Sequence, residues 1–94
     1  MRLLDEEIST LKTTLKTLSK EAKIYLFGSR VDDTKRGGDI DLLVVSSQLG
    51  KRDMRLLRID FCRHFGEQKV DIVLDDGRFE NTFHKMILKK AVLL

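Results

Sequence analysis

The sequence predicts a small α+β domain in which helices flank a mixed three-stranded sheet. Segments with apolar residues at helical spacing alternate along the chain with short runs of apolar and β-branched residues. The 94 residues contain no proline, linker, repeat or low-complexity segment, so we expect one domain over residues 1–94. Because such alternation is typical of helices packed on a sheet, we expect an α/β two-layer arrangement.

The first half of the chain predicts one helix and two strands. The helix runs from about Asp5 to Ala22, and its apolar residues recur at steps of three and four. A short buried strand follows from Lys23 to Phe27 and is ended by Gly28. The run from Ile40 to Val45 is apolar and rich in β-branched residues, which predicts a central strand.

The second half predicts two more helices around a third strand. Helical spacing returns from Arg52 to Phe65, and the apolar run Val70–Leu74 predicts the strand. The turn signal Asp75–Gly77 closes this strand. The pattern is helical again from about Phe79 to Lys90, and Val92–Leu94 is a candidate for a short edge strand.

Composition excludes several classes of protein. With 41% hydrophobic and 35% charged residues, the chain suits a folded domain rather than a disordered one. No apolar run approaches the roughly 20 residues needed to span a bilayer. The start of the chain turns acidic too early for a secretory signal, so we expect no membrane partner. Cys62 is the only cysteine, which excludes an intramolecular disulfide and favours a cytoplasmic location.

The chain is mildly basic, with a net charge of +3. This charge favours anionic ligands without requiring a nucleic acid. The basic residues crowd one segment, which contains Lys51, Arg52, Arg55, Arg58 and Arg63. Such a segment is either a solvated helix face or a docking surface for an acidic partner or RNA.

Asp39 and Asp41 open the second apolar strand, with Ile40 between them. Side chains alternate faces along a strand, so both carboxylates project from the same side. Two carboxylates held that close repel each other, and a divalent cation such as Mg²⁺ removes the repulsion. The spacing also fits a structural arrangement in which Asp39 caps a turn and Asp41 faces solvent.

Gly28 and Ser29 directly follow the first strand. A glycine before a serine at such a turn leaves backbone N–H groups free and lets a ligand approach closely, which suits a phosphate. Gly-Ser turns are also common as purely structural features, so the pair alone leaves both interpretations open.

Together these features resemble the signature of the DNA polymerase β-like nucleotidyltransferase superfamily. That signature is a strand, Gly-Ser, nine intervening residues and Asp-x-Asp opening an apolar strand, and residues 24–45 read IYLFGSRVDDTKRGGDIDLLVV. The family pattern continues with a third carboxylate on the next strand, which Asp71 matches. The chain is similar in particular to the stand-alone minimal nucleotidyltransferases, although many relatives carry serine where this chain has Gly38.

The resemblance implies a polymerase β-like fold and transfer of a nucleotide from an NTP to an acceptor hydroxyl. Asp39, Asp41 and Asp71 would be the catalytic residues and the ligands of two Mg²⁺ ions. Asp71 would also accept or orient the proton of the attacking hydroxyl.

The resemblance also assigns residues to the phosphates of the nucleotide. Gly28 and Ser29 would bind the β- and γ-phosphates through backbone N–H groups and the serine hydroxyl. Arg30 could add a bidentate contact to a phosphate. Alternatively, Arg30 pairs with Asp32 or Asp33.

The acceptor is implied by the resemblance alone. Small nucleotidyltransferases of this kind typically accompany a helical HEPN-domain ribonuclease in prokaryotic toxin–antitoxin modules. There they act as the antitoxin and transfer AMP from ATP to a tyrosine of the toxin. The resemblance therefore implies ATP as donor, a HEPN-domain toxin as partner in a hetero-oligomer, and no requirement for nucleic acid.

Two alternatives stay open beside this hypothesis. The domain could be a catalytically weak module that neutralises a helical partner by binding, or it could transfer a nucleotide to a small molecule. The three carboxylates favour activity, and small-molecule enzymes of this superfamily normally use extra acceptor-binding structure for which 94 residues leave no room.

Several residues outside the motif are expected to be structural. His64 and His84 lie in helical stretches without a partner at ligand spacing, so we expect surface or core roles. Asp75 and Asp76 are predicted to cap a turn or a helix. The last helix is expected to expose an apolar docking or self-association face, formed by Phe83, Met86 and Ile87.

Overall fold

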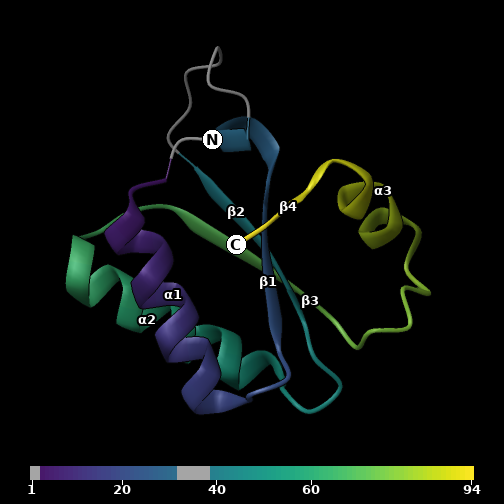
Figure 1. Ribbon diagram of the computed structural model, residues 1–94, viewed down its shortest axis with the longest axis horizontal. Helices are drawn as coiled ribbons and strands as arrows, with labels where there is room; N and C mark the ends of the chain where they lie inside the picture. The colour runs from purple at the N-terminus through teal and green to yellow at the C-terminus, as the bar shows by residue number, and fades with distance from the viewer. Residues whose placement is uncertain (1–2, 32–38) are drawn as a thin grey trace.

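The structure, a computed structural model, describes residues 3–31 and 39–94. Figure 1 shows α1 and α2 together on one side of a central sheet and α3 on the other. No helix in the described ranges is long and apolar enough to cross a bilayer. The elements follow in the order α1 (Asp5–Leu18), β1 (Lys23–Phe27), the 3₁₀ turn η1 (Gly28–Val31), β2 (Ile40–Val45), α2 (Lys51–Phe65), β3 (Val70–Asp75), α3 (Thr82–Lys90) and β4 (Val92–Leu93).

The predicted α+β architecture with a mixed sheet is confirmed, with four strands in place of three. The sheet order is β3-β2-β1-β4, with β2 and β3 parallel and the other pairs antiparallel. The added strand, β4, corresponds to the candidate edge strand. The Leu94 N–H also donates to the Ile24 carbonyl at 3.0 Å, which ties the end of the chain to β1. This arrangement agrees with the polymerase β-like fold.

The main core lies between the sheet and the helix pair α1–α2. Alternate residues of β1 and β2 point toward these helices, and each buried aliphatic side chain contributes about 1.5–3 kcal/mol. The Thr14 hydroxyl donates to Asp60 Oδ2 at 2.6 Å and links the two helices at their surface. The core cluster consists of Leu11, Leu15, Ile24, Leu26, Ile40, Leu42, Val44, Met54, Leu57, Phe61 and Val70.

Strand alternation then decides where the aspartates of the motif project. Ile40 and Leu42 point into the core between the sheet and α1–α2. Asp41 lies between them in β2 and therefore projects from the opposite face of the sheet. The packing of the core thus places the motif on the side of the sheet that α1 and α2 leave free.

α1 is shorter than predicted. It ends at Leu18 rather than at Ala22, because Ser19 adopts an extended backbone with φ −158° and ψ 126°. The Ser19 N–H still donates to the Leu15 carbonyl at 2.9 Å. Serine is disfavoured in the interior of a helix and favoured at helix ends, because its hydroxyl bonds to nearby backbone groups in non-helical conformations. The chain therefore leaves the helix here and turns toward β1.

α3 begins at Thr82 rather than at Phe79. Phe79 has a φ of 52°, in the left-handed region that ends regular helix. The Asn81 side chain instead caps the helix by accepting hydrogen bonds from two backbone N–H groups of its first turn. The helix therefore begins three residues later than predicted, directly after its cap Asn81.

The apolar face predicted on α3 is confirmed for two residues and wrong for the third. Phe83 and Met86 are 57% and 63% exposed. Ile87 is 7% exposed, because α3 contacts β1 and buries this residue. The exposed apolar surface of α3 is therefore limited to Phe83 and Met86.

Candidate functional site

The parallel pairing of β2 with β3 brings two of the predicted aspartates together. In this register Asp41 lies beside Asp71, and Ile40 lies beside Val70. Neighbouring strands are about 4.8 Å apart, and paired residues in register project from the same face. The two carboxylates therefore start from adjacent positions on the face away from α1 and α2.

The carboxylates act on one another electrostatically. The pKa of Asp41 is raised above its ordinary value, first by partial burial and then by the negative charges of Asp71 and Asp39. The positive charge of Lys69 acts in the opposite direction. A carboxylate surrounded in this way favours a cation or a proton as its partner. A divalent cation at this site would relieve the repulsion between the carboxylates.

Asp39 lies at the start of this cluster and pairs with a lysine from outside the sequence motif. Lys69 Nζ lies 3.5 Å from Asp39 Oδ2, and their side chains are 70% and 47% exposed. An ion pair as exposed as this contributes at most about 1 kcal/mol. The only sequence signal for it is a basic residue immediately before the strand that carries Asp71.

Gly28 brings the predicted phosphate turn directly against Asp41. The residue before it, Phe27, is the register partner of Asp41 across β1 and β2. Gly28 has a φ of +80°, and a Cβ placed on it would overlap the Asp41 carboxylate, lying 3.2 Å from its Cγ. Glycine is required here by both the backbone conformation and the close approach. The Gly-Ser turn and the aspartates therefore form one continuous site.

The other two predicted phosphate ligands lie in the same turn. Ser29 and Arg30 belong to η1, which begins at Gly28, and Arg30 is half-buried. The alternative partners of Arg30, Asp32 and Asp33, fall outside the described residues. The positions of Ser29 and Arg30 in η1 place both residues next to Gly28 and hence next to the site.

The donor set fits a hard cation shared with phosphate groups. Carboxylate oxygens are the ligands that Mg²⁺ prefers, and a glycine turn gives a phosphate close access. Over residues 3–31 and 39–94, no three His, Cys, Asp or Glu side chains already stand as a formed metal site. Asp39 is instead turned to Lys69, while Asp41 and Asp71 are held together by their register.

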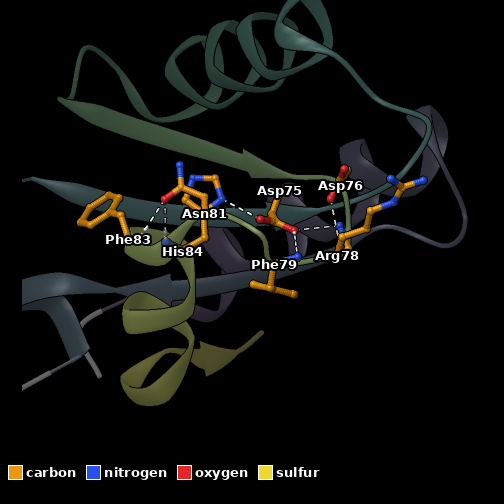
Figure 2. A network of polar contacts seen from close by, with 8 residues as sticks. Asp75, Asp76, Arg78, Phe79, Asn81, Phe83 and His84 are labelled. Carbon is orange, nitrogen blue, oxygen red and sulfur yellow. Dashed lines mark hydrogen bonds and ion pairs between the residues drawn. The ribbon is translucent and has the colours of Figure 1, made fainter.

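The opposite end of the strands carries a carboxylate of a different kind. Asp75 is 4% exposed and accepts hydrogen bonds from the backbone N–H groups of Gly77 at 2.8 Å and Phe79 at 3.1 Å. Its Oδ2 lies 2.7 Å from Nδ1 of His84 (Figure 2). Burial raises the pKa of Asp75, but the hydrogen bonds from His84 and the two backbone groups outweigh it and hold the pKa below its ordinary value.

This network confirms the predicted turn and the predicted core role of His84, and it corrects only the expectation that His84 has no partner. Asp75 and Asp76 both accept hydrogen bonds within the turn, from Gly77 and from Arg78. His84 does have a partner, and the signal was a polar residue ending an apolar strand nine residues before it. A cavity of about 330 Å³ adjoins this pair, but its buried carboxylate is fully hydrogen-bonded, which favours a structural role.

Comparison with known protein families adds an independent finding. Residues 8–93 match the nucleotidyltransferase domain family. No curated protein matches the chain at a significant level. The matched span covers all four strands, η1 and every residue of the candidate site. The chain therefore belongs to the nucleotidyltransferase domain family, and its general activity is nucleotidyl transfer.

Proposed function

We propose that this domain is a Mg²⁺-dependent antitoxin that transfers AMP from ATP to a tyrosine hydroxyl of a HEPN-domain ribonuclease toxin. One observation carries the transfer chemistry: the register that sets Asp41 beside Asp71, with Gly28 packed against Asp41. This arrangement combines negative charge for cations with a turn open to phosphates. The choice of AMP, tyrosine and HEPN partner rests on the resemblance to minimal nucleotidyltransferases.

Asp39, Asp41 and Asp71 are the proposed ligands of two Mg²⁺ ions. When bound, these ions supply positive charge at the α-phosphate and at the departing pyrophosphate. To bind a metal ion, Asp39 would break its ion pair with Lys69. The raised pKa of Asp41 is consistent with it, because a cation offsets the same repulsion that raises the pKa.

The residues of the chain bind the nucleotide and move one proton. The N–H groups of the turn at Gly28 and Ser29 donate to the β- and γ-phosphates, and Arg30 adds a charged donor. The exposed carboxylate of Asp71 accepts the proton of the attacking hydroxyl. A bond forms between the hydroxyl oxygen and the α-phosphorus, the bond from that phosphorus to the bridging oxygen breaks, and pyrophosphate leaves.

A second candidate function is neutralisation of a partner by binding alone. The exposed side chains of Phe83 and Met86 on α3 favour it, because exposed large apolar residues near each other mark interaction surfaces. Under this alternative the partner is bound but not modified.

The test is a labelling experiment. The protein is incubated with Mg²⁺, α-³²P-ATP and a lysate of its host, beside the double variant D39A/D41A. A second double variant, D5A/E6A, removes two exposed carboxylates from the start of α1 and serves as the matched control. We expect label on one protein band with the wild type and the control variant only.

Three other outcomes would change the proposal. Label on RNA or on a small molecule would retain the transferase and reject the protein acceptor. Label from another NTP would reject ATP as the donor. No label with any NTP would reject catalysis and favour the binding module.

A further inference from the structure

Helix α2 carries the entire net charge of the chain. Its 15 residues include five basic and two acidic residues, which gives the helix a net charge of +3. The net charge of the chain is also +3, so the basic and acidic residues outside α2 cancel. All five basic side chains are exposed, and none of them forms an ion pair among residues 3–31 and 39–94. They are Lys51, Arg52, Arg55, Arg58 and Arg63.

The two acidic residues of α2 are engaged within the domain. Asp53 Oδ2 accepts a hydrogen bond from the Gly50 N–H at 2.9 Å and caps the helix. Asp60 accepts from the Thr14 hydroxyl and lies 3.7 Å from His64 Nδ1. The outward surface of α2 is therefore dominated by unpaired positive charge, which attracts an anionic partner.

Apolar residues lie in the middle of this positive surface. Leu56 and Ile59 are 47% and 44% exposed, although the helix already buries three apolar residues on its inner face. Helical spacing places them on one stripe with three of the arginines. We define this stripe as the α2 face; it consists of Arg52, Arg55, Leu56, Ile59 and Arg63.

Ile59 separates two hollows in the surface. The hollow on the α1 side has a volume of about 240 Å³ and is also lined by Thr14, Leu56, Asp60 and Arg63. The hollow on the other side has a volume of about 500 Å³ and is also lined by Arg58, Cys62, Glu67, Gln68 and Lys69. Two hollows on either side of an apolar residue can accept two side chains of a bound helix that are one helical turn apart.

We propose that the α2 face is the docking site for an acidic amphipathic helix of a partner protein. The apolar centre selects a protein over a nucleic acid, whose phosphate backbone would contact the arginines but leave Leu56 and Ile59 unburied. Carboxylates on the flanks of the partner helix would face the arginines. A 15-residue helix is about 22 Å long, which matches about four turns of a bound helix.

Docking at this face would bring the partner near Lys69, which pairs with Asp39. The lining of the larger hollow includes Lys69, whose ammonium pairs with Asp39. A partner segment in this hollow would therefore lie beside the site that we propose for transfer. This last link rests on the proposed function, whereas the docking itself does not.

The test uses a panel of fluorescein-labelled acidic amphipathic peptides with Leu, Ile or Phe anchors at helical spacing. Binding to the wild type is measured by fluorescence anisotropy and by shifts of backbone amide NMR signals. We expect binding that weakens with added salt, with shifts concentrated in residues 51–65. R55E/R63E should weaken binding by at least about tenfold, and I59A should weaken it with an unchanged salt dependence.

The matched control is K89E/K90E, which changes the net charge equally at two exposed residues of α3. Circular dichroism establishes that each variant is folded. An equal loss of binding in K89E/K90E, equal binding of scrambled peptides, tighter binding of a single-stranded RNA, or failure of every peptide would each overturn the proposal. No measurement requires Mg²⁺, ATP or transfer, so an active enzyme can fail this test and an inactive one can pass it.

Discussion

Two aspartates at opposite ends of the parallel pair β2 and β3 have opposite properties. Asp41 in β2 has a raised pKa, because partial burial and two neighbouring carboxylates disfavour its charge. Asp75 at the end of β3 is more deeply buried, yet its pKa is lowered by hydrogen bonds from His84 and two backbone N–H groups. Burial alone therefore does not decide the state of a carboxylate; the groups that face it do.

The difference separates a carboxylate with a structural role, Asp75, from one that we propose to act in transfer, Asp41. The partners of Asp75 all come from its own turn and from α3, so its charge stabilises the fold. The charge of Asp41 lies next to Asp71, and Lys69 offsets it only in part, so a bound cation would offset the remainder. Unfavourable charge of this kind is typical of sites whose residues serve chemistry rather than stability.

The largest expected effect is the difference in nucleotidyl transfer between variants in which Asn replaces either Asp41 or Asp75. Replacement of Asp41 by Asn should lower nucleotidyl transfer by at least about 10²–10³-fold, because it removes a proposed ligand of the Mg²⁺ ions whose positive charge would stabilise the reacting phosphate. Replacement of Asp75 by Asn should leave transfer nearly unchanged at temperatures where the variant is folded. Initial rates with α-labelled ATP measure both, and equal losses in the two variants would erase the distinction between the ends.

Stability should respond to the same pair of substitutions with opposite signs. D75N should lower the free energy of unfolding by about 1–3 kcal/mol, because it removes the charge that His84 and the two N–H groups contact. D41N should raise the free energy of unfolding, because it removes repulsion from Asp71 and Asp39. Urea unfolding without Mg²⁺ measures both, and destabilisation by D41N would contradict the proposed electrostatics.

Gly28 tests whether the phosphate turn and the aspartates form one site. G28A should destabilise the protein by about 1–2 kcal/mol, because alanine disfavours a positive φ. It should also lower transfer, because the added methyl group displaces the Asp41 carboxylate. The control is G77A, because Gly77 also has a positive φ of +99°. A Cβ added at Gly77 would lie 3.9 Å from the nearest side-chain atom and would therefore fit without a clash. Equal activity of the two variants would separate the turn from the site.

The smallest effect should appear in the pH dependence of stability. The lowered pKa of Asp75 means that its stabilisation is present above its unfolded value, near 3.8, and is lost as the pH falls through the folded value. D75N should therefore lose less stability between about pH 5 and pH 3 than the wild type. Urea unfolding across this range measures the difference, and parallel curves would contradict the assigned role of Asp75.

The sequence by itself determined the local structure and the identity of the motif. Apolar periodicity predicted β1 and β2 at their observed bounds and α2 and β3 to within one residue, because these elements bury a continuous face. The order Gly28-Ser29 and Asp39-x-Asp41, followed by Asp71, predicted the family to which residues 8–93 belong. These features depend on the order and spacing of residues along the chain.

The tertiary structure alone decided which distant residues meet. The parallel register of β2 and β3 sets Asp41 beside Asp71, and the pairing of β1 with β2 brings Gly28 against the same carboxylate. The ion pair of Lys69 and the partner of His84 likewise join residues from different elements. No spacing within one segment encodes these contacts, because they follow from how the strands pair and how α3 packs back on the sheet.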